Sequence, residues 1–343
     1  MLGTAAAQPT SVTEKVDALA DRYLKDGLAV GFVIGFIADG KTWSKGYGRV
    51  GGDHDEAPTD RTIYEIGSIT KTFTGILLAC AVERKEVAVD DPVQKHLPKK
   101  VRLPQRGERP IRLVDLVTHT SGLPRMPHNF RPKDPRNPFA DYDTALLHAA
   151  LPKIKLASDA GKTYAYSNFG SGLLGHLLCG KAGAKDYDAL LLARVTGPLG
   201  LKDTRCRLND AMRERFAPAL ARGGRKRLAW DFDALAGCGA IRSTAADMLV
   251  YARANLDPKG TKLGPALEAA QRVRYDQGPG KTAVALGWHR VPNGKSLWHN
   301  GGTGGFRSFL GFDRARGRAV VILANTTSRK VDALAREVMK ALE

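Results

Sequence analysis

The sequence is poor in the residues and motifs that mark several large protein classes. It contains four cysteines in 343 residues, and no two of them are spaced as C-x-x-C. This excludes the common zinc-binding spacings and a dense disulfide framework, while a single disulfide remains open. The eight histidines include no H-E-x-x-H motif. We therefore expect no metal site.

Long apolar runs are also missing. No stretch of about 18 apolar residues occurs, so the sequence predicts no membrane-spanning helix. Residues 1–11 form an N-terminal extension without the basic and apolar regions of a complete signal peptide. The run from Ala5 to Gln8 nevertheless resembles the small-residue end of such a peptide. We therefore favour a periplasmic or secreted protein, with a cytoplasmic location as the alternative.

Acidic residues are fewer than basic ones. Asp and Glu number 35 against 53 Lys and Arg, so the formal net charge is +18. Such an excess suits nucleic-acid binding, but the basic residues are spread along the chain without zinc-finger, ribonucleoprotein or basic-zipper patterns. We expect no nucleic-acid partner and favour an exported enzyme that associates with the anionic cell envelope. The sequence carries no signal for the oligomeric state.

The expected strands lie towards both ends of the chain. Residues 12–26 show the apolar spacing of an amphipathic helix, and residues 330–342 form a closing helix. Asp39 and Gly40 make a hairpin signal, and residues 292–294 make a second one. The expected strands cover residues 29–38, 41–49, 283–291, 295–299, 306–312 and 319–325.

Between these ends the pattern is mostly helical. We predict an α/β sandwich domain of residues 12–64 and 276–343, with an antiparallel sheet flanked by terminal helices, and a mainly helical domain of residues 65–275. The fold class is thus α/β plus all-α. Small-molecule sites tend to form between such domains, so we expect a cleft there. The proline-rich stretch 124–142 cannot be regular structure and is expected over or beside the site.

The chain contains one S-x-x-K motif, which starts at Ser68 and ends at Lys71. Residues three apart lie on the same face of a helix, so these two side chains can touch if the segment is helical. A helix N-terminus also carries unpaired N–H groups that stabilise developing negative charge. We expect Ser68 to be a nucleophile that Lys71 keeps reactive. A helix cap followed by a solvated lysine explains the same residues.

Two further motifs complete an acyl-transfer site. Tyr166-Ser167-Asn168 is the one Y-x-N in the chain, and it precedes a predicted helix. A serine attacks a carbonyl once a base takes its proton, and Lys71 or Tyr166 could be that base. Asn168 can orient a substrate amide.

The third motif, His299-Asn300-Gly301-Gly302, ends a predicted strand. Its glycines leave the strand backbone unshielded, so the N–H groups of Ser68 and Gly302 can form an oxyanion hole.

Each motif also has a plainer explanation. Tyr166 fits a half-buried aromatic, Asn168 fits a helix cap, and the glycines fit a tight turn between strands. A Ser-His-Asp hydrolase is disfavoured because the chain has no G-x-S-x-G elbow. The three motifs in this order favour an acyl-transfer enzyme over separate structural explanations.

Together these motifs resemble those of the serine β-lactamase and penicillin-recognising family. The resemblance is to the class C-like branch, which includes D-alanyl-D-alanine carboxypeptidases and related esterases, and it covers nearly the whole chain. The stretches that carry it are Tyr64–Thr74, His119–Pro124, Tyr164–Asn168, Gly197–Leu201, Ser243–Met248 and Trp298–Gly302.

The resemblance implies a serine acyl-enzyme route without a cofactor. Ser68 would be the nucleophile, Lys71 would activate it, and Tyr166 would be a general base that later protonates the leaving group. Asn168 would bind the substrate amide. The implied substrates are β-lactams or D-Ala-D-Ala peptides, with a carboxylesterase as the alternative and a non-catalytic penicillin-binding or sensor protein as a further one.

One position departs from the family pattern. The third motif normally has a lysine that binds the substrate carboxylate, whereas this chain has His299. A neutral imidazole binds an anion more weakly than a lysine does. The resemblance therefore predicts substrate binding by His299, Gly301 and Gly302, but not efficient β-lactam hydrolysis of the class C type.

Overall fold

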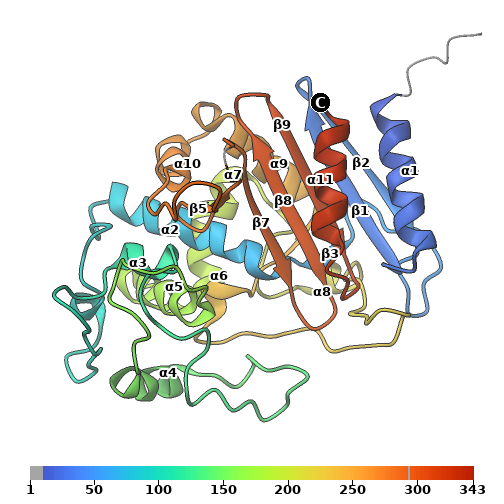
Figure 1. The fold of residues 1–343 in the computed structure, drawn as a ribbon. Coiled ribbons are helices and arrows are strands. Elements are labelled where there is room, and N and C mark those ends of the chain that lie inside the picture. Colours follow the sequence, from blue (N-terminus) through green and yellow to red (C-terminus); the bar gives the residue numbers. More distant parts are fainter. Residues whose placement is uncertain (1–10, 293) are drawn as a thin grey trace, which may run out of the picture.

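The computed structural model describes residues 11–292 and 294–343, and its centre is an antiparallel sheet (Figure 1). The strands run in the spatial order β2-β1-β9-β8-β7-β6-β5. Their bounds are β1 Gly31–Ala38, β2 Lys41–Gly48, β5 Ala283–Val284, β6 His289–Arg290, β7 Leu297–Gly302, β8 Arg307–Asp313 and β9 Arg318–Ala324. Strands from both ends of the chain thus share one sheet, which confirms the predicted fold class.

Helices cover both faces of this sheet. α1 (Val12–Lys25) and α11 (Val331–Ala341) lie on one face, and α9 (Ala245–Leu256) packs on the other against β1 and β9. Strand β1 is apolar throughout because Phe32 and Ile34 face the first layer, while Val33 and Ile37 face the second. The two terminal helices and strands β1, β2, β8 and β9 lie close to their predicted bounds.

The middle of the chain supplies the other helices and a separate two-stranded ribbon, β3 with β4. The bounds are β3 Ile63–Glu65, α2 Thr70–Glu83, α3 Leu113–Val117, α4 Thr144–Ala150, α5 Asn168–Ala182, α6 Tyr187–Leu191, α7 Gly197–Leu199, α8 Asp210–Arg213, β4 Arg242–Thr244 and α10 Gly264–Gln271. The predicted domain boundaries and the cleft between the domains stay predictions. No helix in the described parts of the chain is both long and apolar enough to cross a membrane.

Residues 283–291 form two short strands rather than the single strand that was predicted. β5 and β6 pair with each other in antiparallel fashion, with Val284 opposite His289. The chain reverses at Gly287, whose φ is +78°, and a Cβ there would lie 2.2 Å from the carbonyl oxygen of Lys71. The glycine thus allows both the turn and its close approach to α2. The turn predicted at residues 292–294 includes Asn293, which lies outside the described residues.

Helix α2 is buried on every side. All residues from Thr70 to Ala81 are buried, because α5 and α10 pack against the helix. The hydroxyls on the helix find partners: Thr72 donates to the carbonyl of Ile69 at 2.8 Å, and Thr74 donates to the carbonyl of Gly237 at 2.7 Å. α2 is therefore the central helix of the molecule.

The four cysteines are free thiols, so no disulfide links them. The stretch 124–142 contains no helix or strand, as its prolines predicted.

Candidate active site

The segment before Ser68 is held by strand-like hydrogen bonding. Beyond the β3–β4 pair, the N–H of Ile66 donates to the carbonyl of Ile241 at 3.0 Å. Gly67 then has a φ of +50°, and a Cβ there would lie 2.6 Å from the backbone nitrogen of Gly302. Only glycine allows this turn with β7 so close. One 3-10 turn follows and leads into α2, so Ser68 stands at the start of the helix as predicted.

Lys71 joins three segments that are far apart in the sequence. Its side chain is buried, and its Nζ donates to Ser68 Oγ at 3.0 Å, to Asn168 Oδ1 at 2.9 Å and to the carbonyl oxygen of Cys238 at 2.7 Å. An ammonium has three protons, and here each has an acceptor. None of the ion pairs among the described residues includes Lys71. It is a buried ammonium surrounded by neutral oxygen atoms.

The carbonyl of Cys238 is placed by close packing between α2 and α5. Thr74 holds the neighbouring Gly237 through its hydroxyl, as described above. On the other side, a Cβ on Gly175 of α5 would lie 2.9 Å from the Cα of Gly237. Small residues at these positions let the two backbones meet, and the turn between them points its carbonyl at Lys71.

Tyr166 and Asn168 lie on either side of the residue that caps α5. Ser167 Oγ accepts a hydrogen bond from the N–H of Gly170 at 2.9 Å and donates to the carbonyl of Pro124 at 2.7 Å. The cap is therefore Ser167, and the explanation of Asn168 as a cap is wrong. The capped turn fixes the backbone from which both neighbouring side chains project.

The amide of Asn168 has a defined orientation. Its Oδ1 accepts from Lys71, so its NH2 group is the part left for other partners. Within the described residues that NH2 group meets the sulfur of Met126 at 3.8 Å. A thioether is a weak acceptor, so the NH2 group remains able to donate to a carbonyl oxygen.

His119 holds Tyr166 from a second direction. It has a φ of +62°, which is uncommon for a residue other than glycine. Its carbonyl accepts from the N–H of Ala165 at 2.8 Å, and its Nδ1 accepts from the N–H of Ser167 at 3.2 Å. The centroids of the His119 and Tyr166 rings are 4.3 Å apart. Strained backbone at such a position points to a positioning role.

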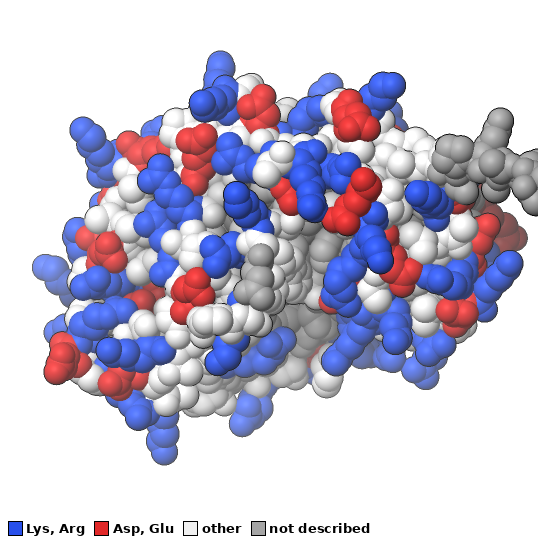
Figure 2. All heavy atoms as spheres, turned by 45° about the horizontal axis from the view of Figure 1, so that its top comes forward, with Lys and Arg blue, Asp and Glu red and all other residues white. Residues whose placement is uncertain are grey.

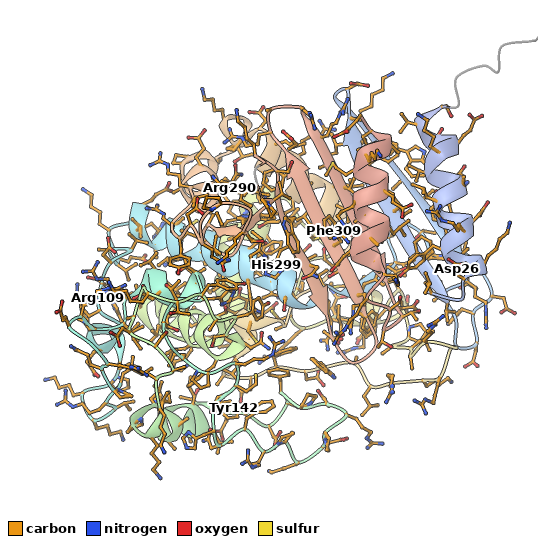
Figure 3. The ribbon with its side chains drawn as sticks, in the orientation of Figure 1. Asp26, Arg109, Tyr142, Arg290, His299 and Phe309 are labelled. Atoms are coloured by element: carbon orange, nitrogen blue, oxygen red, sulfur yellow. The ribbon has the colours of Figure 1, made fainter. Side chains whose placement is uncertain are left out.

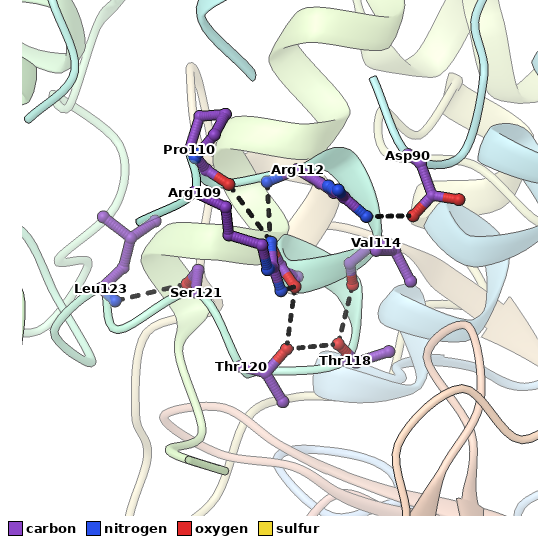
Figure 4. A network of polar contacts seen from close by, with 10 residues as sticks. Asp90, Arg109, Pro110, Arg112, Val114, Thr118, Thr120, Ser121 and Leu123 are labelled. Carbon is purple, nitrogen blue, oxygen red and sulfur yellow. Dashed lines mark hydrogen bonds and ion pairs between the residues drawn. The ribbon is translucent and has the colours of Figure 1, made fainter. Parts of the chain in front are cut away.

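A polar network anchors the turn that contains His119 (Figure 4). The buried carboxylate of Asp115 accepts from Arg109 at 2.7 and 2.9 Å and from Thr120 Oγ1 at 3.3 Å. The hydroxyls of Thr118 and Thr120 are 2.9 Å apart. The residues on both sides of His119 are thus fixed, which sustains its unusual backbone conformation.

The end of β7 lies against the segment that carries Ser68. β6 pairs only with the first two residues of β7, so within the described sheet the edge from His299 to Gly302 has no strand on that side. A Cβ on Gly301 would lie 1.9 Å from the carbonyl oxygen of Ile66, whereas one on Gly302 would meet the flexible side chain of Arg307. Close packing therefore explains the glycine at 301. The predicted substrate contacts of both glycines stay predictions.

His299 projects from β7 where the sheet meets the helices (Figure 3). Its side chain is 1% exposed, and its Nδ1 lies 2.6 Å from the carbonyl oxygen of Asn300. A carbonyl only accepts, so Nδ1 carries the proton and Nε2 carries a lone pair. That Nε2 has no hydrogen-bond partner among the described residues. The centroid of the ring is 6.3 Å from that of Tyr166 and 4.9 Å from that of His289.

Three histidines near Tyr166 are held neutral. Burial lowers the pKa of His119 and of His299 well below its ordinary value, and the nearby charge of Lys71 adds to the effect. Burial, followed by the same charge, lowers the pKa of His289 to about 4. His289 Nε2 lies 3.1 Å from the hydroxyl of Tyr164. The cationic charge inside this cluster therefore belongs to Lys71.

The structure brings together Ser68, Lys71 and Asn168 by direct hydrogen bonds, and Tyr166 by ring contact. The Tyr166 ring centroid is 4.9 Å from Lys71 Nζ. Its other cationic neighbour is Arg125, whose guanidinium carbon lies 5.2 Å from the centroid. Such an arrangement can hold a serine hydroxyl and bind an amide carbonyl at a lysine that also contacts a phenol ring.

Sequence reasoning did not single out His119, His289 or Arg125 as site residues. Arg125 belongs to the predicted loop 124–142, and its neighbour Met126 contacts Asn168, so this end of the loop does lie beside the site. His119 is the first residue of the stretch His119–Pro124 that carries the family resemblance, which was an available signal. His289 had none, because its contact with Tyr164 spans 125 positions of sequence.

Comparison with known proteins matches the chain to beta-lactamases and to a D-alanyl-D-alanine carboxypeptidase. The family model described as Beta-lactamase matches residues 16–343. The chain is 27% identical over 318 residues to the D-alanyl-D-alanine-carboxypeptidase/endopeptidase AmpH of Escherichia coli K12, covering 88% of this chain and 81% of that protein. It is 26% identical over 354 residues to a beta-lactamase of Pseudomonas fluorescens, covering 92% and 94% of the two chains. A solved mutant class C beta-lactamase shares the fold, with a TM-score of 0.83, 22% identity and coverage of 99% of this chain and 100% of that one.

Proposed function

The chain belongs to the beta-lactamase family and is a serine hydrolase, and we propose that Ser68 forms a covalent acyl-enzyme with its substrate. The observation that carries this proposal is the contact of Lys71 Nζ with both Ser68 Oγ, at 3.0 Å, and Asn168 Oδ1, at 2.9 Å. A buried ammonium in contact with the hydroxyl stabilises the negative charge that develops on the oxygen as it attacks.

Proton transfer is assigned to Tyr166, with the ammonium of Lys71 as the cation beside it. Tyr166, as its phenolate, takes the proton of Ser68 as the serine oxygen attacks the substrate carbonyl, and it then passes that proton to the leaving group. His119 acts on this step as a positioning residue, because it holds the backbone on both sides of Tyr166. Water then attacks the acyl-enzyme and releases the acid.

Substrate binding uses groups that remain available around Ser68. The NH2 group of Asn168 donates to the carbonyl of the substrate amide. The backbone N–H groups of Ser68 and Gly302 form the oxyanion hole, which the close approach of β7 at Gly67 supports. Gly301 contributes by letting β7 approach, and His299 lines the same edge.

The proposed substrates are β-lactams or peptides that end in D-Ala-D-Ala. In these substrates an amide lies on the acyl side of the bond that breaks. A carboxylate lies on the leaving-group side. AmpH, a relative at 27% identity, is named for carboxypeptidase and endopeptidase activity, whereas the relative from Pseudomonas fluorescens is named a beta-lactamase. We also propose export to the periplasm, in keeping with a substrate of the cell envelope.

A carboxylesterase is the second candidate. The observation that favours it is the buried, neutral His299 at the position where the family's third motif has a lysine. Without that cation the site binds a substrate carboxylate less tightly. An uncharged ester is then at less of a disadvantage against a charged substrate.

A panel of three substrates tests these proposals. Purified protein is assayed with a chromogenic cephalosporin, a p-nitrophenyl ester and an acylated D-Ala-D-Ala peptide, alongside Ser68→Ala. We expect turnover of at least one substrate and its loss in the variant. Turnover of the ester alone would favour the esterase. No turnover of any of the three would contradict the proposal, and full activity in Ser68→Ala would move the nucleophile elsewhere.

A further inference from the structure

His299 is unsuited to bind a substrate anion in this chain. Its Nδ1 proton is committed to the carbonyl of Asn300 at 2.6 Å, so Nε2 presents a lone pair. A lone pair repels a carboxylate and accepts only from a donor. The ring is also 1% exposed, and protonation would place a second buried cation beside Lys71. A substrate carboxylate needs another partner.

Arg125 is a cation at the edge of the same site. Its guanidinium carbon lies 5.2 Å from the centroid of the Tyr166 ring, and the side chain is exposed. No ion pair or side-chain hydrogen bond recorded among the described residues includes Arg125. Its five N–H donors are therefore available to a ligand, unlike those of Arg109, which are paired with Asp115.

The backbone of Arg125 is held firmly at the start of α5. Its carbonyl accepts from the N–H of Phe169 at 3.1 Å, and the preceding carbonyl, of Pro124, accepts from Ser167 Oγ at 2.7 Å. The next residue, Met126, contacts Asn168. The loop thus fixes the backbone from which this arginine projects, although the rest of the stretch is irregular.

We propose that Arg125 is the anchor for a carboxylate on the leaving-group side of the substrate, the role for which the family's third motif uses a lysine. Tyr166 protonates the leaving group in the proposed function, so a cation stacked on its ring lies beside the departing part of the substrate. A guanidinium binds a carboxylate through two parallel N–H···O bonds, which adds geometric selection to the charge. This inference rests on the proposed function of Tyr166 and names the feature by which the site selects its substrate.

A pair of matched esters tests this assignment. The same N-acylglycine is prepared as its 3-carboxyphenyl ester and as its 3-carbamoylphenyl ester, so that the two leaving groups differ in charge and little in size. Esters suit the test because either proposed activity would cleave them. The measured quantity is the ratio of kcat/KM for the charged ester to kcat/KM for the neutral one.

We expect Arg125→Gln to lower this ratio about tenfold, mainly through a higher KM for the charged ester, as the loss of one charge-assisted pair predicts. Arg125→Lys keeps the charge without the fork and should retain part of the ratio. Arg131→Gln is the matched control, because Arg131 is an exposed arginine of the same loop whose recorded side-chain bond is to the carbonyl of Phe130. Its ratio should equal that of the unchanged protein.

A ratio within twofold of the unchanged protein in folded Arg125→Gln would overturn the assignment. The same holds if Arg131→Gln lowers the ratio as much, because the effect would then be general electrostatics. Failure of the proposed function gives a different result, since the unchanged protein would then cleave neither ester. Arg125→Lys keeps the test decisive if Arg125→Gln does not fold.

Discussion

At the scale of single residues, the site is defined by a buried ammonium without an anionic partner. Lys71 satisfies its three protons on a hydroxyl, an amide oxygen and a carbonyl, so its charge is hydrogen-bonded but not neutralised. The histidines around it cannot share the charge, because their pKa values are lowered by burial. The charge of Lys71 is therefore available to stabilise a negative charge that forms on Ser68 or Tyr166.

Replacing Lys71 by Met should lower kcat/KM by about a thousandfold or more, because Ser68 loses the group that activates it. The measurement is the rate of ester hydrolysis per mole of folded protein. Lys45→Met is the control, since Lys45 is an exposed lysine paired with Asp17 at the surface. Equal losses in the two variants would contradict the role of Lys71.

The neutral histidines predict acid-sensitive stability. The folded pKa of His289 is about 4, below the ordinary value of about 6.5, so between these values the unfolded chain binds more protons than the folded one. Stability from this group is complete above about pH 6.5 and is lost as the pH falls towards 4, at up to about 1.4 kcal/mol per pH unit.

Chemical denaturation at pH 7, 5.5 and 4.5 measures this dependence. His289→Gln keeps a hydrogen-bonding group near Tyr164 but does not titrate. Its unfolding free energy should therefore fall less steeply with acid than that of the unchanged protein. Parallel curves for the two proteins would mean that His289 is not held neutral in the folded state.

At the scale of elements, the site is a junction between α2, α5 and the free edge of β7. The junction depends on backbones that approach more closely than side chains allow, at Gly67 with Gly302 and at Gly175 with Gly237. Gly67 is the most demanding of these, because it combines a positive φ with a neighbour in close contact.

Gly67→Ala should destabilise the protein and lower its activity together. The new Cβ costs about 1 kcal/mol for the positive φ, and the clash with Gly302 adds about 1–3 kcal/mol. Gly40→Ala separates the two effects, because Gly40 has a φ of +71° and nothing within 4 Å of the added Cβ. Thermal unfolding and ester hydrolysis are measured for both. If the two variants lose equal stability and keep equal activity, the position of β7 does not depend on the glycine at 67.

The elements that sequence analysis predicted are those with local signals. Ser11 and Glu14 form a capping box at the start of α1, and the hairpin at Asp39 and Gly40 has the positive φ values that such a turn needs. Ser68 and Lys71 touch because their spacing alone brings them together on a helical turn.

What the sequence did not predict depends on contacts between distant residues. The division of 283–291 into β5 and β6 follows from the packing of Gly287 on α2, which no local pattern encodes. The burial of α2 on all sides has the same cause. The place of Arg125 over Tyr166 depends on a loop whose path is set by the start of α5.

At the scale of the whole molecule, basic side chains outnumber acidic ones. Figure 2 shows Lys and Arg over much of the visible face, interleaved with Asp and Glu. The net charge of +18 is thus spread out rather than gathered in one groove on that face. We expect such a surface to attract anionic polymers or membranes without selecting a sequence or a shape.

We predict salt-sensitive binding to anionic vesicles. Vesicles that contain phosphatidylglycerol should sediment the protein at low ionic strength, and vesicles of phosphatidylcholine alone should not. The binding should be largely lost at about 0.3 M salt, because the screening length becomes shorter than about 10 Å. Equal sedimentation with both kinds of vesicle, or no sedimentation at low salt, would contradict association through charge.

Acylation of Ser68 is the step on which the proposed function depends. The protein is incubated with a penicillin, quenched in acid, and its mass is measured intact and after proteolysis, beside Ser68→Ala. If Ser68 is the nucleophile, a transient or stable mass increase equal to that of the penicillin is located on the peptide that contains Ser68 and is absent from the variant. An adduct on another residue, or an equal adduct in Ser68→Ala, would contradict it.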